Sequence, residues 1–249
     1  MRRPVMAGNW KMYKTPAETS TFFEKFRPLV AGSTHCEIVV SAPFTDLQTA
    51  VEAALSTRIQ IGAQNLFWEK EGAFTGEISC PMIRSTGATH VLVGHSERRQ
   101  YFGETDEAVL KKTLAALASD LTPIVCVGER LEQRESDDTE LVLIEQFSKG
   151  IAGLEAKQFA RIVIAYEPVW AIGTGKTATP EIAAEAHQMI RNEVQKRYGE
   201  DQAARMRILY GGSVKPENVK SLMAQPEIDG VLVGGASLDP VSFGSIVNY

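Results

Sequence analysis

The sequence predicts an α/β fold, a closed (β/α)8 barrel of eight parallel strands each followed by a helix, with residues 1–249 in one domain. Three observations support this prediction. Eight short runs rich in Val, Ile and Leu recur along the chain, with amphipathic segments between most of them. Eight units over 249 residues give about 31 residues each, near the size of one βαβ step. No linker rich in Pro, Gly or Ser divides the chain, so a single barrel fits its length.

The apolar runs are the predicted strands. They lack the strict alternation of a sheet with one wet face, as expected of parallel strands buried on both faces. In chain order the predicted strands are residues 5–9, 37–42, 59–63, 89–93, 121–127, 161–166, 206–210 and 229–233. An open, doubly wound sheet shows the same succession of strands and helices, so it stays as the alternative fold.

The amphipathic segments are the predicted helices, at residues 16–30, 45–55, 105–118, 138–152, 179–198, 216–224 and 240–248. Four of them have a proline near the first helical position, where its missing N–H is not needed. These starts are Thr15-Pro16, Thr179-Pro180, Lys215-Pro216 and Asp239-Pro240.

Composition argues against two classes of partner, nucleic acids and membranes. The formal net charge is -5 and no block of basic residues occurs, so a nucleic acid is not expected as a partner. No long apolar stretch follows the first residues, since polar Asn9 and Lys11 come at once. Neither a signal peptide nor a membrane span is therefore expected.

The cysteines and histidines exclude two further classes of site. The three cysteines are odd in number and far apart, which suits a reducing cytoplasm and not a disulfide framework. The four histidines show neither HxxxH spacing nor a nearby pair of cysteines, so a metal site is not expected. These residues are Cys36, Cys80 and Cys126, and His35, His90, His95 and His187.

Polar or glycine-rich residues stand at the ends of five predicted strands. In a barrel of this kind, chemistry takes place at the carboxyl ends of the strands and in the loops that follow them. Side chains from these ends are therefore expected to meet on one rim. The five ends are Gly8-Asn9-Trp10-Lys11, Gly94-His95-Ser96-Glu97, Tyr166-Glu167, Tyr210-Gly211-Gly212-Ser213 and Gly234-Gly235-Ala236-Ser237.

Glu167 is the strongest candidate for chemistry among them. It ends a buried apolar run and is followed by Pro168, which has no N–H to continue the strand. An ionised carboxylate is costly to bury, so its place at a strand end needs a functional reason. An apolar loop with two glycines follows, over residues 169–177. The pattern indicates a general base under a loop that can close over it.

The glycines after the last two strands indicate a phosphate site. Glycine lets a backbone N–H approach an anion closely, and barrels commonly bind phosphate at these two loops. Lys11 supplies a positive charge from the opposite side. A small phosphorylated substrate follows as a hypothesis.

Six motifs together resemble the triosephosphate isomerase family, and they span the chain from the first strand to the last. They are AGNWKMY, GAFTGEIS, GHSERRQYFGE, AYEPVWAIGTGKTATP, LYGGSVKP and DGVLVGGASL. The resemblance implies interconversion of dihydroxyacetone phosphate and glyceraldehyde 3-phosphate in glycolysis and gluconeogenesis, without cofactor or metal. It implies a TIM barrel, a cytoplasmic location and a homodimer.

The resemblance also implies the role of each site residue. Glu167 is the base that moves a proton between adjacent carbons, and neutral His95 polarises the carbonyl. A short helix over 96–101 is expected to begin just after His95, and its N-terminal field disfavours the imidazolium form. Lys11 lies near the phosphate and the enediolate, with Asn9 as its polar neighbour. Supporting residues are Ser96 and Glu97, and the phosphate-binding positions are Gly173, Ser213, Gly234 and Gly235.

Two loops complete what the resemblance implies. The lid segment closes over the substrate and consists of Pro168, Val169, Trp170, Ala171, Ile172, Gly173, Thr174, Gly175 and Lys176. The dimer loop has an apolar residue at its tip and enters a pocket of a second subunit near Asn9 and Lys11. Its residues are Phe74, Thr75, Gly76 and Glu77. Cys126 matches a family cysteine close to the base, and packing is its expected role.

Two alternative functions remain open. One is a barrel that binds a sugar phosphate without catalysis, although such a protein needs no base. The other is an enzyme acting on a different sugar phosphate, which requires a pocket with room beyond three carbons.

Overall fold

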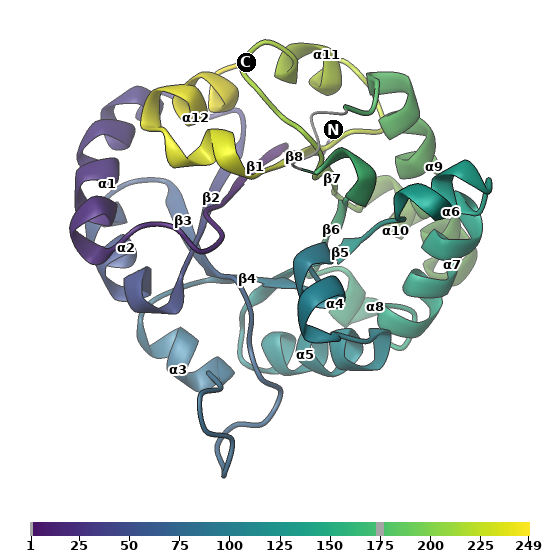
Figure 1. The fold of residues 1–249 in the computed structure, drawn as a ribbon, viewed down its shortest axis with the longest axis horizontal. Helices are drawn as coiled ribbons and strands as arrows, with labels where there is room; N and C mark the ends of the chain where they lie inside the picture. Colours follow the sequence, from purple (N-terminus) through teal and green to yellow (C-terminus); the bar gives the residue numbers. More distant parts are fainter. Residues whose placement is uncertain (1, 173–176) are drawn as a thin grey trace.

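Eight parallel strands close into a barrel in the computed structural model, which describes residues 2–172 and 177–249 (Figure 1). Each strand pairs with the next along the chain, and β1 pairs with β8 to complete the ring. The predicted (β/α)8 barrel is confirmed, and the open doubly wound alternative is wrong. The strands are β1 Val5–Asn9, β2 Glu37–Ala42, β3 Ile59–Ala63, β4 His90–Val93, β5 Thr122–Val127, β6 Val163–Tyr166, β7 Ile208–Tyr210 and β8 Gly230–Val233.

The first three strands have the predicted bounds, and the last five begin one or two residues later than predicted. The start of β6 shows why. The N–H of Arg161 donates to the carbonyl of Gln158, and the N–H of Ile162 donates to that of Phe159. These are turn hydrogen bonds that end the preceding helix. Both residues therefore belong to the approach to the strand, although their composition suits a strand.

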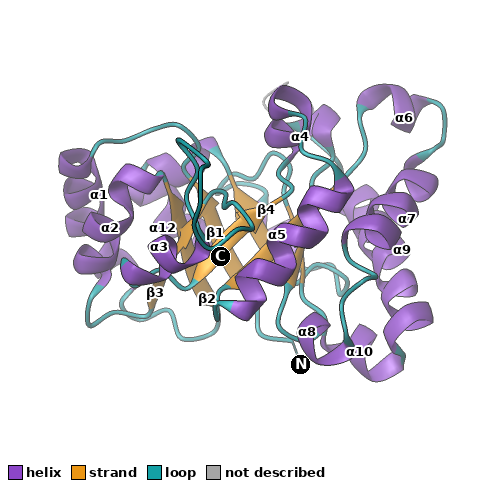
Figure 2. Ribbon diagram, turned by 90° about the horizontal axis from the view of Figure 1, so that it is seen from below, coloured by secondary structure: helices purple, strands orange, loops and turns teal. Residues whose placement is uncertain are grey.

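Helices surround the barrel, as Figure 2 shows from the side. The long ones are α1 Pro16–Val30, α5 Asp106–Ala118, α7 Thr139–Gly150 and α9 Pro180–Tyr198, and shorter ones at predicted positions are α2 Leu47–Ala54, α4 Ser96–Phe102, α11 Val219–Met223 and α12 Pro240–Val247. Those absent from the prediction are α3 Cys80–Ser85, α6 Leu131–Glu135, α8 Ala156–Phe159 and α10 Glu200–Arg205, with the 3-10 turns η2 Val169–Ala171 and η3 Gly235–Leu238. A third 3-10 turn, η1 Phe44–Asp46, overlaps the start of the helix predicted over 45–55. Helices of four to six residues carry too little periodicity for a sequence pattern to find.

Three of the four predicted proline starts are confirmed. Helices α1, α9 and α12 each have proline in the first turn, and Thr15, Thr179 and Asp239 cap them by accepting a backbone N–H. The fourth start is wrong, because α11 begins at Val219, three residues beyond Pro216. There the side chain of Asn218 accepts the N–H of Lys215 and donates to the carbonyl of Ser213, which holds the segment as a turn.

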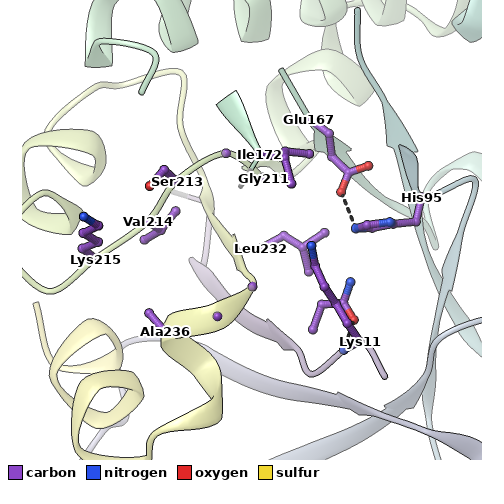
Figure 3. Close-up of a pocket in the computed structure, with 14 residues that line it drawn as sticks. Lys11, His95, Glu167, Ile172, Gly211, Ser213, Val214, Lys215, Leu232 and Ala236 are labelled. Atoms are coloured by element: carbon purple, nitrogen blue, oxygen red, sulfur yellow. Dashed lines mark hydrogen bonds and ion pairs between the residues drawn. The ribbon is translucent and has the colours of Figure 1, made fainter. Parts of the chain in front are cut away.

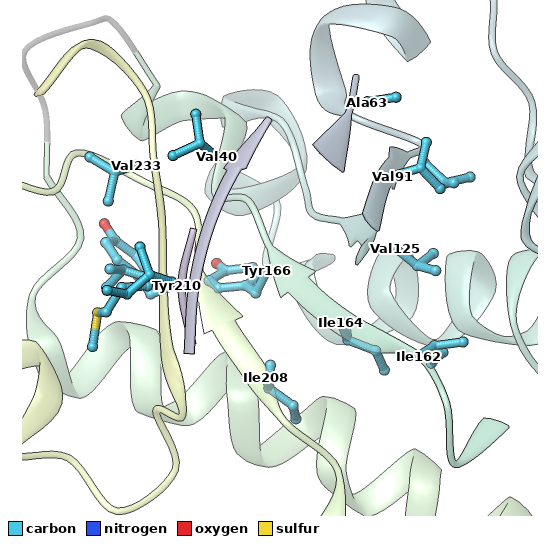
Figure 4. Close-up of a cluster of buried hydrophobic side chains, with 14 of the residues drawn as sticks. Val40, Ala63, Val91, Val125, Ile162, Ile164, Tyr166, Ile208, Tyr210 and Val233 are labelled. Atoms are coloured by element: carbon cyan, nitrogen blue, oxygen red, sulfur yellow. The ribbon is translucent and has the colours of Figure 1, made fainter. Parts of the chain in front are cut away.

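Neighbouring strand residues belong to two different cores. Val39, Leu92, Cys126, Ala165 and Leu209 pack with one another inside the barrel. Residues one position away, such as Val40, Val125, Ile164 and Ile208, face outward and pack under the helices (Figure 4). Because successive side chains point to opposite faces of a strand, both faces are buried, as predicted. This rigid barrel fixes where each strand ends, and so positions the site. No helix in the described part of the chain is long and apolar enough to cross a membrane.

Candidate active site

One cavity of about 270 Å³ opens at the carboxyl ends of the strands (Figure 3). Asn9 ends β1, His95 directly precedes α4, and Glu167 directly follows β6. The structure thus brings these side chains together on one rim, as predicted. Lining residues are Asn9, Lys11, His95, Glu167, Ile172, Gly211, Gly212, Ser213, Val214, Lys215, Leu232, Gly234, Gly235 and Ala236.

Glu167 is buried, with 2% of its surface exposed. One carboxylate oxygen, Oε1, lies 2.9 Å from Nε2 of His95, and the other accepts the backbone N–H of Ser96 at 2.9 Å. Burial alone raises the pKa of Glu167, but His95, the Ser96 N–H and Lys11 outweigh it and lower the pKa. The carboxylate is therefore ionised at neutral pH and able to accept a proton.

His95 is the N-cap of α4, and the hydrogen bonds of its ring define its tautomer. Nδ1 accepts the N–H of Glu97 at 3.3 Å, so it carries no proton, and the ring proton stands on Nε2, facing Glu167. Burial lowers the pKa of His95, but the Glu167 carboxylate more than offsets this and raises the pKa. The charge of the ring thus depends on where the carboxylate lies. When the carboxylate moves away, burial and the field of α4 favour neutral imidazole.

Lys11 has a backbone conformation that is rare outside glycine, with φ at 53°. Its N–H donates to Oδ1 of Asn9 at 3.0 Å, and its carbonyl accepts from Nε2 of Gln64 at 2.9 Å. The ammonium lies 2.5 Å from Oε1 of Glu97. Figure 3 shows the side chain reaching toward His95. These hydrogen bonds stabilise the strained backbone of Lys11, and its ammonium thereby lies in the cavity. Backbone strain of this kind is typical of functional sites.

Glycines form the wall of the cavity on the side of β7 and β8. A Cβ on Gly211 would lie 2.9 Å from Cγ of Glu167, so only glycine lets the strand pass so close to the carboxylate. A Cβ on Gly235 would meet nothing within 4 Å, and one on Gly234 would meet only the end of Lys11. These two backbones are therefore open to a ligand, with the hydroxyl residue Ser213 beside them on the rim. This part of the cavity suits a compact anion.

Among the described residues, no group of three or more His, Cys, Asp or Glu side chains is placed so that it could hold a metal ion.

Comparison with known proteins assigns the chain to a family. The sequence model described as triosephosphate isomerase matches residues 4–249. The triosephosphate isomerase of Solibacter usitatus is 70% identical over 249 residues, covering all of both chains, and that of Citrifermentans bemidjiense is 56% identical over all of this chain and 99% of its own. The chain belongs to the triosephosphate isomerase family. A crystal structure of the triosephosphate isomerase of Bartonella henselae superimposes with a TM-score of 0.89 at 38% identity, covering 99% of this chain and 98% of that one.

The structure brings together most of the residues that the family resemblance named. Asn9, Lys11, His95 and Glu167 share the cavity with Ser213, Gly234 and Gly235. Ser96 and Glu97 stand behind it and contact Glu167 and Lys11 through hydrogen bonds. Gly173 lies outside the described residues. Cys126 is fully buried in the barrel interior. The chemical roles of these residues stay predictions.

The lid segment is described only as far as Ile172, and Gly173, Thr174, Gly175 and Lys176 lie outside the described residues. Pro168 precedes the 3-10 turn Val169–Ala171, in which Trp170 donates its indole N–H to Oε1 of Glu129 at 2.8 Å. Ile172 faces the cavity. The start of the predicted lid is therefore joined to the segment that follows β5.

The dimer loop lies between β3 and α3, in a segment that projects away from the barrel (Figure 1). Phe74 is 43% exposed and packs against Phe67, with ring centroids 4.6 Å apart. Thr75, Gly76 and Glu77 are exposed beside it. Association into a homodimer stays a prediction.

The sequence prediction missed the end of β5. Gly128 directly adjoins the backbone of Glu167, and Glu129 accepts hydrogen bonds from Tyr166 and Trp170. The signal was present, because Gly128-Glu129 ends a predicted strand as the other rim residues do. Further lining residues lacked such a signal, since their side chains are apolar or lie beyond the strand ends: Val214, Lys215 and Leu232.

Proposed function

We propose that this protein interconverts dihydroxyacetone phosphate and D-glyceraldehyde 3-phosphate as an intramolecular aldose–ketose isomerase. The observation that carries the proposal is the contact of Glu167 with His95, at 2.9 Å, in a cavity that Lys11 and the glycine wall share. A carboxylate, an imidazole and an ammonium are the groups that proton transfer beside a carbonyl needs. Membership of the triosephosphate isomerase family supports the same substrate.

The mechanism begins with the carboxylate of Glu167. It removes a proton from the hydroxymethyl carbon of dihydroxyacetone phosphate, and the electron pair moves onto the carbonyl oxygen to form an enediolate. Neutral His95 donates its Nε2 hydrogen bond to that oxygen, and the ammonium of Lys11 stabilises the negative charge that develops. His95 then gives its Nε2 proton to that oxygen and takes up the proton of the neighbouring hydroxyl, so that the negative charge moves to the other oxygen. The protonated Glu167 returns its proton to the former carbonyl carbon, and the C=O bond that forms at the other carbon gives the aldehyde.

The phosphate group occupies the glycine wall in this proposal. Backbone N–H groups of Gly173, Gly234 and Gly235, together with Ser213, hold the phosphate while Lys11 faces it from the other side. The lid segment then closes over the substrate and excludes water. Closure keeps the enediolate planar, which suppresses loss of phosphate from the intermediate.

The remaining proposals concern the setting of the reaction. The groups named above suffice for proton transfer, so the proposed reaction uses neither cofactor nor metal. We place the enzyme in the cytoplasm, in glycolysis and gluconeogenesis, as a homodimer that buries Phe74 and Thr75. Each subunit is a single domain over residues 1–249, without nucleic-acid or membrane partners.

The test is isomerisation of glyceraldehyde 3-phosphate by purified protein without added metal or cofactor, beside Glu167→Ala and the control Glu52→Ala, an exposed carboxylate on α2. Loss of the base is expected to lower kcat by about 10²- to 10⁴-fold, with the fold retained. Near-normal turnover by folded Glu167→Ala protein contradicts the mechanism. Binding of the triose phosphate without turnover by the wild type favours the non-catalytic barrel, and turnover of a larger sugar phosphate favours the other enzyme.

A further inference from the structure

Strand β4 leaves the barrel wall one residue before His95. Its pairing with β5 ends at Val93 and Val125, and Gly94 then turns with φ at 74°. Successive carbonyls of a strand point to opposite neighbours. Because the carbonyl of Val127 accepts the N–H of Glu167, which directly follows β6, the carbonyl of Cys126 points toward the side of β4. The departure of β4 leaves that carbonyl without a strand partner.

Arg99 of α4 supplies the missing partner. Its Nη2 donates to the carbonyl of Cys126 at 3.3 Å, and its Nε donates to the carbonyl of Gly94 at 2.8 Å. Nη1 lies 2.6 Å from Oδ1 of Asp106, at the start of α5. The side chain is 19% exposed, so these contacts lie largely out of water. One guanidinium thus joins the ends of two strands and the next helix.

The two carbonyls that Arg99 holds adjoin the two proposed proton-transfer groups. Gly94 precedes His95 directly, and Cys126 lies beside Glu167, with which its thiol interacts. We propose that Arg99 is a positioning residue for the reaction, which fixes the end of β4 against the end of β5 and so sets the contact between His95 and Glu167. This inference rests on the proposed function of that pair.

The chemistry of the guanidinium suits this role. Its planar fork donates in several fixed directions at once, whereas the ammonium of a lysine is a point charge without that fork. Gly94 belongs to the same arrangement, since a Cβ there would lie 3.2 Å from both Nη2 of Arg99 and the Cys126 carbonyl. Without Arg99, two largely buried carbonyls lose their donors and the peptide before His95 is free to rotate.

A second network retains the fold when Arg99 is removed. The N–H of Gly94 donates to Oε1 of Glu104, whose other oxygen contacts Arg98 at 2.8 Å and Lys112 at 2.7 Å. These contacts do not involve Arg99. The effect of its loss is therefore expected in the geometry of His95 more than in folding.

The experiment compares Arg99→Met, Arg99→Lys and Asp106→Asn with the wild type. Arg197→Met is the matched control, because Arg197 also donates to a backbone carbonyl, that of Ala152, but lies far from the rim in α9. Arg99→Met is expected to lower kcat by about 10- to 100-fold, since an error of about 1 Å in a reacting group costs about 100-fold. KM is expected to stay within about twofold. For Arg99→Lys and Asp106→Asn we expect a smaller decrease in kcat, and for Arg197→Met no decrease.

The pH profile separates positioning from a loss of folded protein. His95, Lys11 and Cys126 face Glu167, and His95 contributes most to lowering its pKa against burial. A looser contact with His95 moves the acidic limb of kcat/KM to higher pH in Arg99→Met. A smaller fraction of folded enzyme lowers kcat and leaves the limb where it was, and that result overturns the inference.

An NMR measurement without turnover separates this inference from the proposed function. The ¹⁵N and ¹H signals of the His95 ring are compared between the wild type and the four variants. A shift in Arg99→Met, absent in Arg197→Met, supports the inference even in a protein without isomerase activity. Unchanged ring signals and unchanged kcat in folded Arg99→Met overturn it, while the activity of the wild type leaves the proposed function in place.

Discussion

Gly128 follows the end of β5 and lies directly against the backbone of Glu167, which follows the end of β6. The N–H of Glu167 donates to the carbonyl of Val127 at 2.7 Å, which brings the two backbones together. A Cβ built on Gly128 lies 1.8 Å from the carbonyl oxygen of Glu167 and 2.6 Å from its carbonyl carbon. Real Cβ atoms essentially never come within 3.0 Å of such a neighbour. Gly128→Ala must therefore move one of the two backbones.

The size of the movement follows from these distances, and the surroundings of Gly128 decide which side moves. Reaching 3.0 Å requires a shift of at least about 1.2 Å. The side chain of Gln146 holds both the N–H and the carbonyl of Gly128, at 2.8 and 3.0 Å. Glu167 is therefore the residue expected to move. A displacement of about 1 Å in a reacting group costs about 100-fold in rate, and overpacking costs about 1–3 kcal/mol in the free energy of unfolding.

The assay measures kcat and KM for Gly128→Ala, together with urea unfolding at the same protein concentration. Gly32→Ala is the control, since its Cβ would meet nothing within 4 Å and its φ is not positive. We expect kcat to fall by about 100-fold in Gly128→Ala and to stay unchanged in Gly32→Ala. A folded Gly128→Ala protein with the kcat of the wild type refutes the argument that this glycine sets the place of the base.

Two further predictions concern stability and assembly. Hydrogen bonds from His90 and Arg207 outweigh burial and lower the pKa of Glu37 from 4.5 to about 2. Because the folded-state pKa lies below the unfolded one, these contacts stabilise the fold fully above about pH 4.5, by about 2 kcal/mol after allowance for solvent screening, and the benefit disappears as pH falls toward 2. The difference in unfolding free energy between wild type and Glu37→Gln should therefore shrink from pH 7 to pH 3.5, and a constant difference in urea titrations contradicts this. Phe74→Asp should shift the protein to monomers in sedimentation and lower kcat/KM, whereas the control Leu141→Asp, an exposed apolar residue on α7, should do neither; an active monomer argues against the proposed dimer.

The sequence determined the features that depend on neighbouring residues. Buried parallel strands require apolar residues on both faces, and the runs at 5–9 and 37–42 show this directly. Helix starts are equally local, since Thr15 accepts the N–H of Glu18 only three residues away. The site at the carboxyl ends of the strands was predicted from the same local information, because a polar residue at the end of a buried strand is costly to bury unless it has a function.

Only the tertiary structure decided how those local features meet. Closure depends on the pairing of β1 with β8, more than 200 residues apart, and the strand pattern fits an open sheet equally well. The 2.9 Å contact of His95 with Glu167, the adjustment of Gly128 to the Glu167 backbone and the three acceptors of Arg99 all join different strands. Such contacts leave no periodic signal in a sequence, because a backbone carbonyl belongs to every residue type. The sequence therefore identifies the residues that carry the chemistry, whereas the closed barrel sets the distances at which they act together.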